Sequence, residues 1–235
     1  MALPKLEVPT YELTLPSTNK VVKFRPFLVK EQKVLYVAQQ DSENEQVISD
    51  AIGELVKNCT FDKVDPLISP VFDIEYIFLQ LRSKSVGETI DIQVKCPDDN
   101  KTSVGVKINL QDVSVQMTTG HSNEVVLSDN MKIVLRYPIL RDMRNVKGDN
   151  EMDRVFHILS KCIHEVHHGD KIYNAIDVTE EDLKTFIEQM TTDQLEKIMD
   201  FFNTMPKLRH VVEVTNPNTK KKGEVIVEGL TSFLG

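Results

Sequence analysis

A β pattern that stops at a proline occurs twice in this chain, and it limits the possible folds more than any other feature. Residues 20–28 read Lys-Val-Val-Lys-Phe-Arg-Pro-Phe-Leu, and residues 132–140 read Lys-Ile-Val-Leu-Arg-Tyr-Pro-Ile-Leu. Each run alternates like a β-strand and stops at Pro26 or Pro138, because proline has no N–H to donate to a sheet. An apolar pair and a segment with helical spacing follow each proline.

A second similarity lies further along the chain. The stretch 94–110, which begins Val-Lys-Cys-Pro, resembles 214–230, which begins Val-Thr-Asn-Pro. The offsets are 138 − 26 = 112 and 217 − 97 = 120 positions, so the two similarities are nearly in phase. A true duplication and a chance recurrence of short β patterns both remain open at this point.

The two similarities predict an α+β fold with two similar halves. Each half contains a proline-stopped strand, a helical group and a small antiparallel β-hairpin. The expected parts are an extended N-terminal arm over 1–19, a first α+β lobe over 20–115 and a second α+β lobe over 116–235. The Pro-rich arm needs a pairing partner to be ordered, either on its own domain or on a neighbouring subunit.

Apolar periodicity and capping residues predict the individual elements. Helices are expected over 28–40, after a break at 41–44 to about 58, from 69–70 to about 82, over 150–167, and from the capping sequences at 179–182 and 191–194. The third of these is apolar nearly all round and should be the buried centre of the first half. Hairpins are expected at 89–96 with 102–110, at 125–127 with 131–137 and at 210–214 with 223–227, and a short strand at 171–173.

Composition excludes several classes of protein. The 235 residues carry a net charge of −8 with a pI near 5.3, which disfavours the nucleic-acid backbone as main partner. The basic run Lys220–Lys222 lies in a turn context and is expected to be a solvated hairpin tip. No apolar run reaches the roughly 18 residues of a membrane span, and the N-terminus lacks the pattern of a secretion signal. Three scattered cysteines, Cys59, Cys96 and Cys162, favour a reducing compartment over a disulfide framework.

One catalytic motif is matched formally. The run His164-Glu165-Val166-His167-His168 satisfies H-E-x-x-H, which on a helix places two zinc ligands on one face with the glutamate as general base. Gly169 follows the second histidine, so His168 would lie in a fraying last turn. No third ligand is indicated clearly, although Asp170 and Asp177 are candidates. A zinc hydrolase is therefore kept only as an unfavoured alternative.

The two predicted hairpin turns have half of a zinc-knuckle pattern at most. Cys96 opens one turn, Asn216 opens the other, and His210 is too isolated to complete a four-ligand site. A G-x-S-x-G elbow and a glycine-rich phosphate loop are both missing. We therefore predict no catalytic residue, no cofactor and no bound metal.

Several structural phrases resemble the T4-type bacteriophage baseplate protein family. They are 24–35 (Phe-Arg-Pro-Phe-Leu-Val-Lys-Glu-Gln-Lys-Val-Leu), 73–76, 81–88, 204–208 and 227–234. The resemblance runs from about Val8 to the C-terminus. It implies a myophage tail protein of the baseplate hub, located in the virion tail and, during assembly, in the cytoplasm of the host. Some such tail proteins have cysteine pairs at the two hairpin turns, but this sequence does not, so we infer no bound metal from the resemblance.

Three functions are compared on this basis. The first is a non-enzymatic hub subunit or hub assembly factor that contacts other tail proteins, with a possible homo-oligomer. The second is a chaperone that holds the tape-measure protein, with the third helix and the stretch 198–205 as its groove, although both segments also read as plain core. The third is the zinc hydrolase through His164, Glu165 and His168.

Overall fold

The structure is a computed structural model that describes residues 6–40, 45–143, 146 and 150–233. It divides the chain into two compact units, one formed by 1–116 with 207–235 and the other by 117–206. Both units combine helices with small antiparallel sheets, which confirms the predicted α+β class. The expected break at 41–44 lies outside the described residues.

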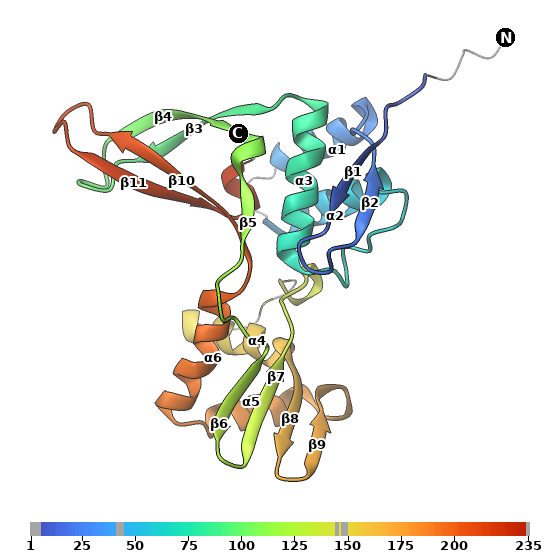
Figure 1. Cartoon of the computed structure of the whole chain (residues 1–235), viewed down its shortest axis with the longest axis vertical. Helices are drawn as coiled ribbons and strands as arrows, with labels where there is room; N and C mark the ends of the chain where they lie inside the picture. The colour runs from blue at the N-terminus through green and yellow to red at the C-terminus, as the bar shows by residue number, and fades with distance from the viewer. Residues whose placement is uncertain (1–5, 41–44, 144–145, 147–149, 234–235) are drawn as a thin grey trace. The chain divides into compact units, whose positions relative to one another are not determined.

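The first unit contains three helices and seven strands in its described part (Figure 1). The helices are α1 (Val29–Gln40), α2 (Glu45–Cys59) and α3 (Val71–Ser85). The strands are β1 (Tyr11–Thr14), β2 (Val21–Phe24), β3 (Thr89–Lys95), β4 (Ser103–Asn109), β5 (Ser114–Gln116), β10 (Lys207–Thr215) and β11 (Lys222–Glu228). They form three antiparallel sheets in the orders β1-β2, β3-β4 and β11-β10-β5.

Helix α3 is the buried helix that its sequence predicts. Ile74, Ile77 and Leu81 are fully buried, and α3 packs against α2 and β10. The helix starts directly after Pro70, and its last turn carries Arg82, whose charge opposes the negative end of the helix dipole.

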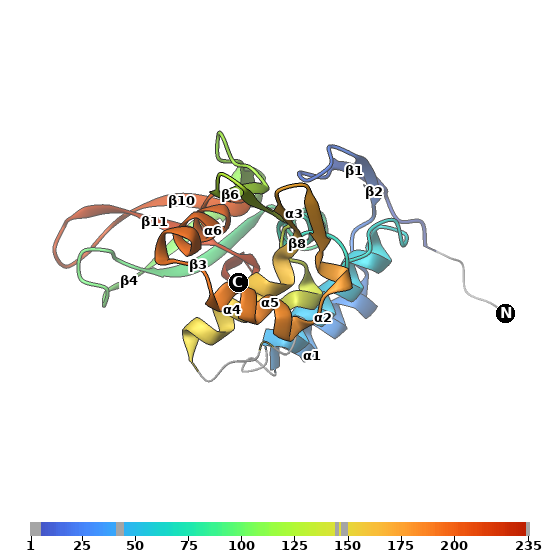
Figure 2. The same cartoon turned by 90° about the horizontal axis from the view of Figure 1, so that it is seen from below.

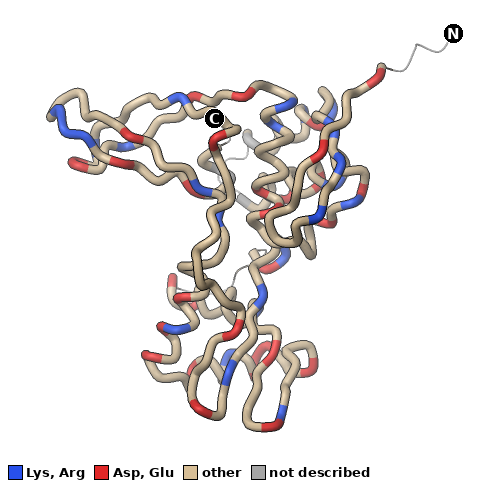
Figure 3. Tube along the Cα trace, in the orientation of Figure 1, with Lys and Arg blue, Asp and Glu red and all other residues tan. Residues whose placement is uncertain are grey.

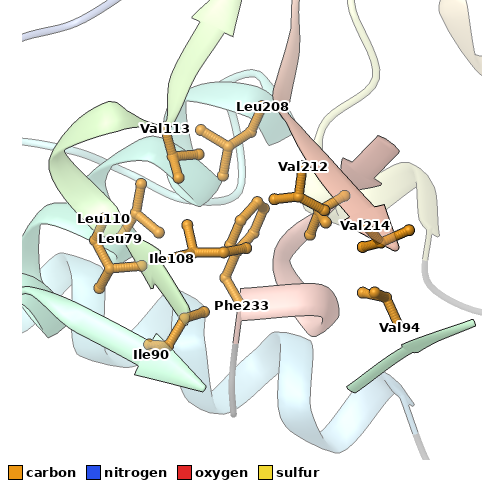
Figure 4. Packing of buried hydrophobic residues seen from close by; sticks show 11 residues of the cluster. Leu79, Ile90, Val94, Ile108, Leu110, Val113, Leu208, Val212, Val214 and Phe233 are labelled. Atoms are coloured by element: carbon orange, nitrogen blue, oxygen red, sulfur yellow. The ribbon is translucent and has the colours of Figure 1, made fainter. Parts of the chain in front are cut away.

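One hydrophobic cluster joins α3 to both long hairpins of this unit (Figure 4). Its centre is Phe233, from the short 3₁₀ segment Leu230–Phe233 near the C-terminus, which is completely buried. The other members are Leu79, Ile90, Val94, Ile108, Leu110, Val113, Leu208, Val212, Val214 and Val227. Residues from 79–113 and from 208–233, which are distant in sequence, therefore share one core.

The second unit packs helices against one four-stranded sheet. Its helices are α4 (Glu151–Cys162), α5 (Glu180–Glu188) and α6 (Thr192–Thr204), and its strands are β6 (Glu124–Ser128), β7 (Met131–Leu135), β8 (Ile163–His168) and β9 (Lys171–Asn174). The strands lie in the order β6-β7-β8-β9 and are all antiparallel. The predicted capping sequences are confirmed, since Thr179 with Asp182 and Thr191 with Gln194 form capping boxes.

The prediction of a helix over 150–167 is wrong at its end. Helix α4 stops at Cys162, and Ile163–His168 forms strand β8 between β7 and β9. The apolar spacing that suggested a longer helix is also compatible with a strand, and pairing with β7 decides between them. Gly169, at φ +57°, then turns β8 into β9.

The expected arm over 1–19 is only partly an arm. Strand β1 pairs with β2, and Leu13 is buried. The backbone N–H of Ser17 donates to Asp73 Oδ1 at 3.0 Å, and its hydroxyl donates to the other carboxylate oxygen. Residues 11–14 therefore form a strand of the first unit, residues 16–18 form a turn, and the continuous described stretch without secondary structure is 6–10.

The grouping of the last 29 residues also differs from the expected lobe over 116–235. Residues 207–235 belong to the first compact unit because β10 pairs with β5, with Lys207 opposite Gln116. Pairing between strands that are distant in sequence cannot be read from the periodicity of either strand. None of the helices in the described part of the chain has the length and apolar character that a membrane crossing requires.

Candidate interaction surfaces

Each copy of the proline-stopped strand carries an arginine that pairs with a carboxylate six residues later. In the first unit, Arg25 Nη2 donates to Glu31 Oε1 at 2.9 Å, and the Leu28 backbone N–H donates to Glu31 Oε2 at 2.7 Å. The Arg25 backbone N–H donates to the Cys59 carbonyl at 3.0 Å. One carboxylate thus fixes the turn from β2 into α1.

The second unit repeats this arrangement after β7. Arg136 Nη1 and Nη2 donate to Asp142 Oδ2 and Oδ1 at 2.6 and 2.8 Å, and the Ile139 backbone N–H donates to Oδ2 at 2.9 Å. The Arg136 backbone N–H donates to the Cys162 carbonyl at 2.8 Å. The two proline-stopped strands therefore share this pattern of hydrogen bonds as well as their sequence pattern.

Burial and pairing determine the charge states of these groups. Burial alone would raise the pKa of Glu31, but hydrogen bonds from Arg25 and the Leu28 N–H hold it below its ordinary value. The hydrogen bond to Asp142 raises the pKa of Arg136. Burial raises the pKa of the Cys59 thiol to about 11 and that of Cys162 to about 12, so both thiols are neutral at pH 7. These residues position the backbone.

The tips of the β3–β4 and β10–β11 hairpins share one turn hydrogen bond, from residue i+4 back to residue i, although the first tip is one residue longer. In the first tip, the N–H of Cys96 donates to the Thr102 carbonyl at 2.8 Å, and that of Asn100 donates to the Cys96 carbonyl at 2.9 Å. In the second, the N–H of Asn216 donates to the Lys221 carbonyl and that of Lys220 to the Asn216 carbonyl, both at 2.9 Å. The resemblance between 94–110 and 214–230 is thus also visible in backbone geometry.

The two tips are hydrogen-bonded to each other. Asn216, only 1% exposed, donates from Nδ2 to Asp98 Oδ1 and Asp99 Oδ2, both at 2.9 Å. Thr219 Oγ1 donates to Asp98 Oδ2 at 2.6 Å. Gly223 fits against Pro97, because a Cβ at this glycine would come within 2.5 Å of the proline ring. This tip cluster (Asp98, Asp99, Asn216 and Thr219) holds the two hairpins together.

The tip cluster does not have the composition of a zinc knuckle. Cys96 contributes a buried sulfur from one tip, but the second tip presents an amide and a hydroxyl in place of thiolates. Within the described ranges, no three His, Cys, Asp or Glu side chains are placed to hold one metal ion. The hydrogen bonds from Thr102 and backbone N–H groups instead keep the pKa of Asp99 far below its usual range.

The H-E-x-x-H match lies on a strand, so the geometry behind the zinc-hydrolase alternative is not present. Residues four apart on a strand are about 13 Å apart along it, too far for His164 and His168 to bind one zinc at about 2 Å. Glu165 Oε2 instead lies 2.7 Å from His167 Nε2. The possible third ligands, Asp170 and Asp177, fall in a turn and in a short 3₁₀ segment.

The described surface presents several large apolar side chains on regular elements. On α1, Val29 is 80% exposed and Tyr36 is 63% exposed. Val211 and Ile226 face each other across β10 and β11 and are 43% and 53% exposed. The basic run 220–222 is exposed at the tip of this hairpin, where Figure 3 shows the lysines.

Residues 8–235 match the family described as T4 bacteriophage base plate protein. The chain belongs to this family. No curated protein and no solved structure matches it. Membership makes it a phage baseplate protein of the virion tail, with other tail proteins as partners. The matched range includes residues of both compact units and all of the described residues from 8 onward.

Sequence reasoning missed the carboxylates that fix the two turns of the baseplate protein. Glu31 and Asp142 looked like two of many surface acids, but each is 5% exposed. A signal was available, because each follows the arginine of its repeated pattern by six positions. Asn216 carried no such signal, since its partners come from the other hairpin.

Proposed function

We propose that this baseplate protein is a non-enzymatic hub subunit or hub assembly factor that acts through protein–protein contacts. The family match supports the baseplate location, and the exposed apolar residues of α1 support the mode of action. Val29 and Tyr36 are held on a formed helix, so a neighbour can bury them without ordering a flexible segment. The place of action extends to the host cytoplasm while the tail is assembled.

A surface substitution on α1 tests this mode of action. Tyr36→Asp should leave the fold intact and reduce incorporation into tails by about tenfold or more, because a charge enters an apolar contact. Val21→Asp on β2 is the matched control, since Val21 and Tyr36 are both 63% exposed. Equal incorporation of both variants would argue against α1 as the contact surface.

Residues 6–10 offer a second contact. They carry no secondary structure, and Leu6 is 89% exposed. We expect deletion of 1–9 to keep the thermal unfolding temperature and to weaken tail assembly. Deletion of 1–19 should also unfold the first unit, because it removes β1 and the Ser17–Asp73 hydrogen bonds. If deletion of 1–9 left assembly unchanged, the segment would have no docking role.

A chaperone for the tape-measure protein is the second candidate, and one observation favours it. Helices α1 and α2 lie side by side (Figure 2) and border a cavity of about 210 Å³. Val34, Ala51 and Leu55 line it together with polar residues, which suits an apolar side chain from a partner helix. The groove expected from the sequence is not available, because α3 and the Ile198 and Phe201 side chains are core.

Quantitative mass spectrometry of purified virions beside infected-cell lysate distinguishes these roles. A fixed stoichiometry in the particle is expected for a hub subunit. Absence from the particle, with recovery on the tape-measure protein in lysate, would favour the chaperone. Absence from the particle and from tail intermediates would contradict both roles.

A further inference from the structure

The two edges of the four-stranded sheet in the second unit differ in how far they are covered. At the β6 edge, Lys197 and Gln194 of α6 donate to the carbonyls of Val126 and Leu127 at 3.1 and 3.5 Å. At the β9 edge no described strand follows β9, and all four of its residues are exposed. Exposed edge strands are templates for pairing with another chain.

The phase of the hairpin shows which backbone groups point toward the open edge. A two-residue turn, Gly169-Asp170, joins His168 to Lys171, so these two residues form the hydrogen-bonded closing pair. Bonded and non-bonded pairs alternate in an antiparallel ladder. The N–H and C=O groups of Ile172 and Asn174 therefore point away from β8, toward the open edge.

The side chains of β9 suit a partner of identical sequence. An antiparallel second copy of β9 that places Tyr173 opposite its own symmetry mate also places Ile172 opposite Asn174 of the partner strand, and the reverse. Both of these flanking pairs then exchange two backbone hydrogen bonds. Ile172 and Tyr173, 58% and 45% exposed, would be covered, and Lys171 would not oppose a like charge.

We propose that β9 is a homodimerisation edge, through which two copies of the baseplate protein join their four-stranded sheets about a two-fold axis at Tyr173. The occupant of the edge is a second copy of this chain. This inference names a partner beyond the proposed hub role. It does not depend on that role, because a dimer of the isolated chain can form whether or not the virion retains the protein.

A charge pair at the axis tests the proposal on the full chain. Sedimentation equilibrium should give about twice the chain mass of 26.8 kDa for the unmodified protein. Tyr173→Lys and Tyr173→Glu should each raise the dimer dissociation constant by about tenfold or more, because like charges then face each other. An equimolar mixture of the two variants should regain the dimer, since opposite charges meet in the mixed pair.

Val126→Lys is the matched control, because Val126 lies in the same cross-strand row as Ile172 and is also 58% exposed. It should keep the dimer, since α6 covers its edge. Ile172→Pro provides an independent test by removing an N–H that β8 does not use. A monomeric unmodified protein, a dimer that Tyr173→Lys leaves unchanged, or mixed variants that stay monomeric would each overturn the proposal.

Discussion

The turn after β2 and the turn after β7 perform the same task with different balances of burial and geometry. The side chains of Arg25 and Glu31 are 13% and 6% exposed and share a single bond. Arg136 is 35% exposed and grips the 5% exposed Asp142 side chain with both terminal nitrogens. The Glu31 side chain accepts one hydrogen bond from the buried Arg25 guanidinium. The shorter Asp142 side chain accepts two from the more exposed Arg136 guanidinium, as in a bidentate pair. Both pairs therefore fix a backbone turn, but burying Arg25 costs more desolvation free energy than burying the partly exposed Arg136.

The largest effect is expected from Glu31→Ala. It leaves the Arg25 guanidinium buried without its carboxylate, and breaking a buried pair in this way costs about 3–5 kcal/mol. Urea unfolding followed by circular dichroism would measure the loss. Asp91→Ala, which removes an exposed ion pair with Lys107, is the control and should change stability by less than about 1 kcal/mol.

A smaller loss, about 1–3 kcal/mol, is expected for Asp142→Ala. Arg136 can turn its partly exposed guanidinium to water once the carboxylate is removed. The same urea titration, read with a probe in the second unit, provides the comparison. A loss equal to that of Glu31→Ala would show that bidentate geometry outweighs burial in setting the strength of the turn.

Acid should weaken the first turn through Glu31. Its folded pKa is lowered, so its contribution is fully present above the unfolded value of about 4.3 and is lost as the pH falls through the folded pKa. Stability of the unmodified protein should therefore decline more steeply below pH 4 than that of Glu31→Gln. Parallel pH profiles for the two proteins would show that protonation of Glu31 does not cause the loss of stability in acid.

The smallest effect concerns the cysteines behind the turns. Burial raises the pKa of Cys59 to about 11 and of Cys162 to about 12, so both should react slowly with a maleimide at pH 7.5. Glu31→Ala should speed modification of Cys59 relative to Cys162, because the carbonyl of Cys59 accepts the Arg25 N–H. Peptide mass spectrometry of partly labelled protein gives both rates. An unchanged ratio of the Cys59 rate to the Cys162 rate would show that the packing of Cys59 does not depend on the turn.

Local chemistry made much of the fold predictable. The alternation of 89–96 and 102–110 and the capping residues Thr179 and Thr191 each lead to one local structure, and the elements form where they indicate. The run 163–168 fits a helix and a strand equally well, and its pairing with β9 and with β7, almost thirty residues earlier, decides between them. The contact surfaces were harder to predict from the sequence. The exposure of β9, for example, follows from its place at the end of the strand order in the described sheet, which the sequence of β9 does not reveal.

The pairing of β5 with β10 has a consequence for synthesis. Lys207 lies opposite Gln116, so the chain leaves the first unit and returns to it at neighbouring positions. During translation, residues 117–206 emerge whole and can fold while the first unit still lacks Leu208, Val212 and Phe233 from its core. The second unit is therefore synthesised completely before the first unit is. A nascent chain arrested before residue 207 would contain the complete second unit and a first unit with an exposed apolar core, which favours aggregation.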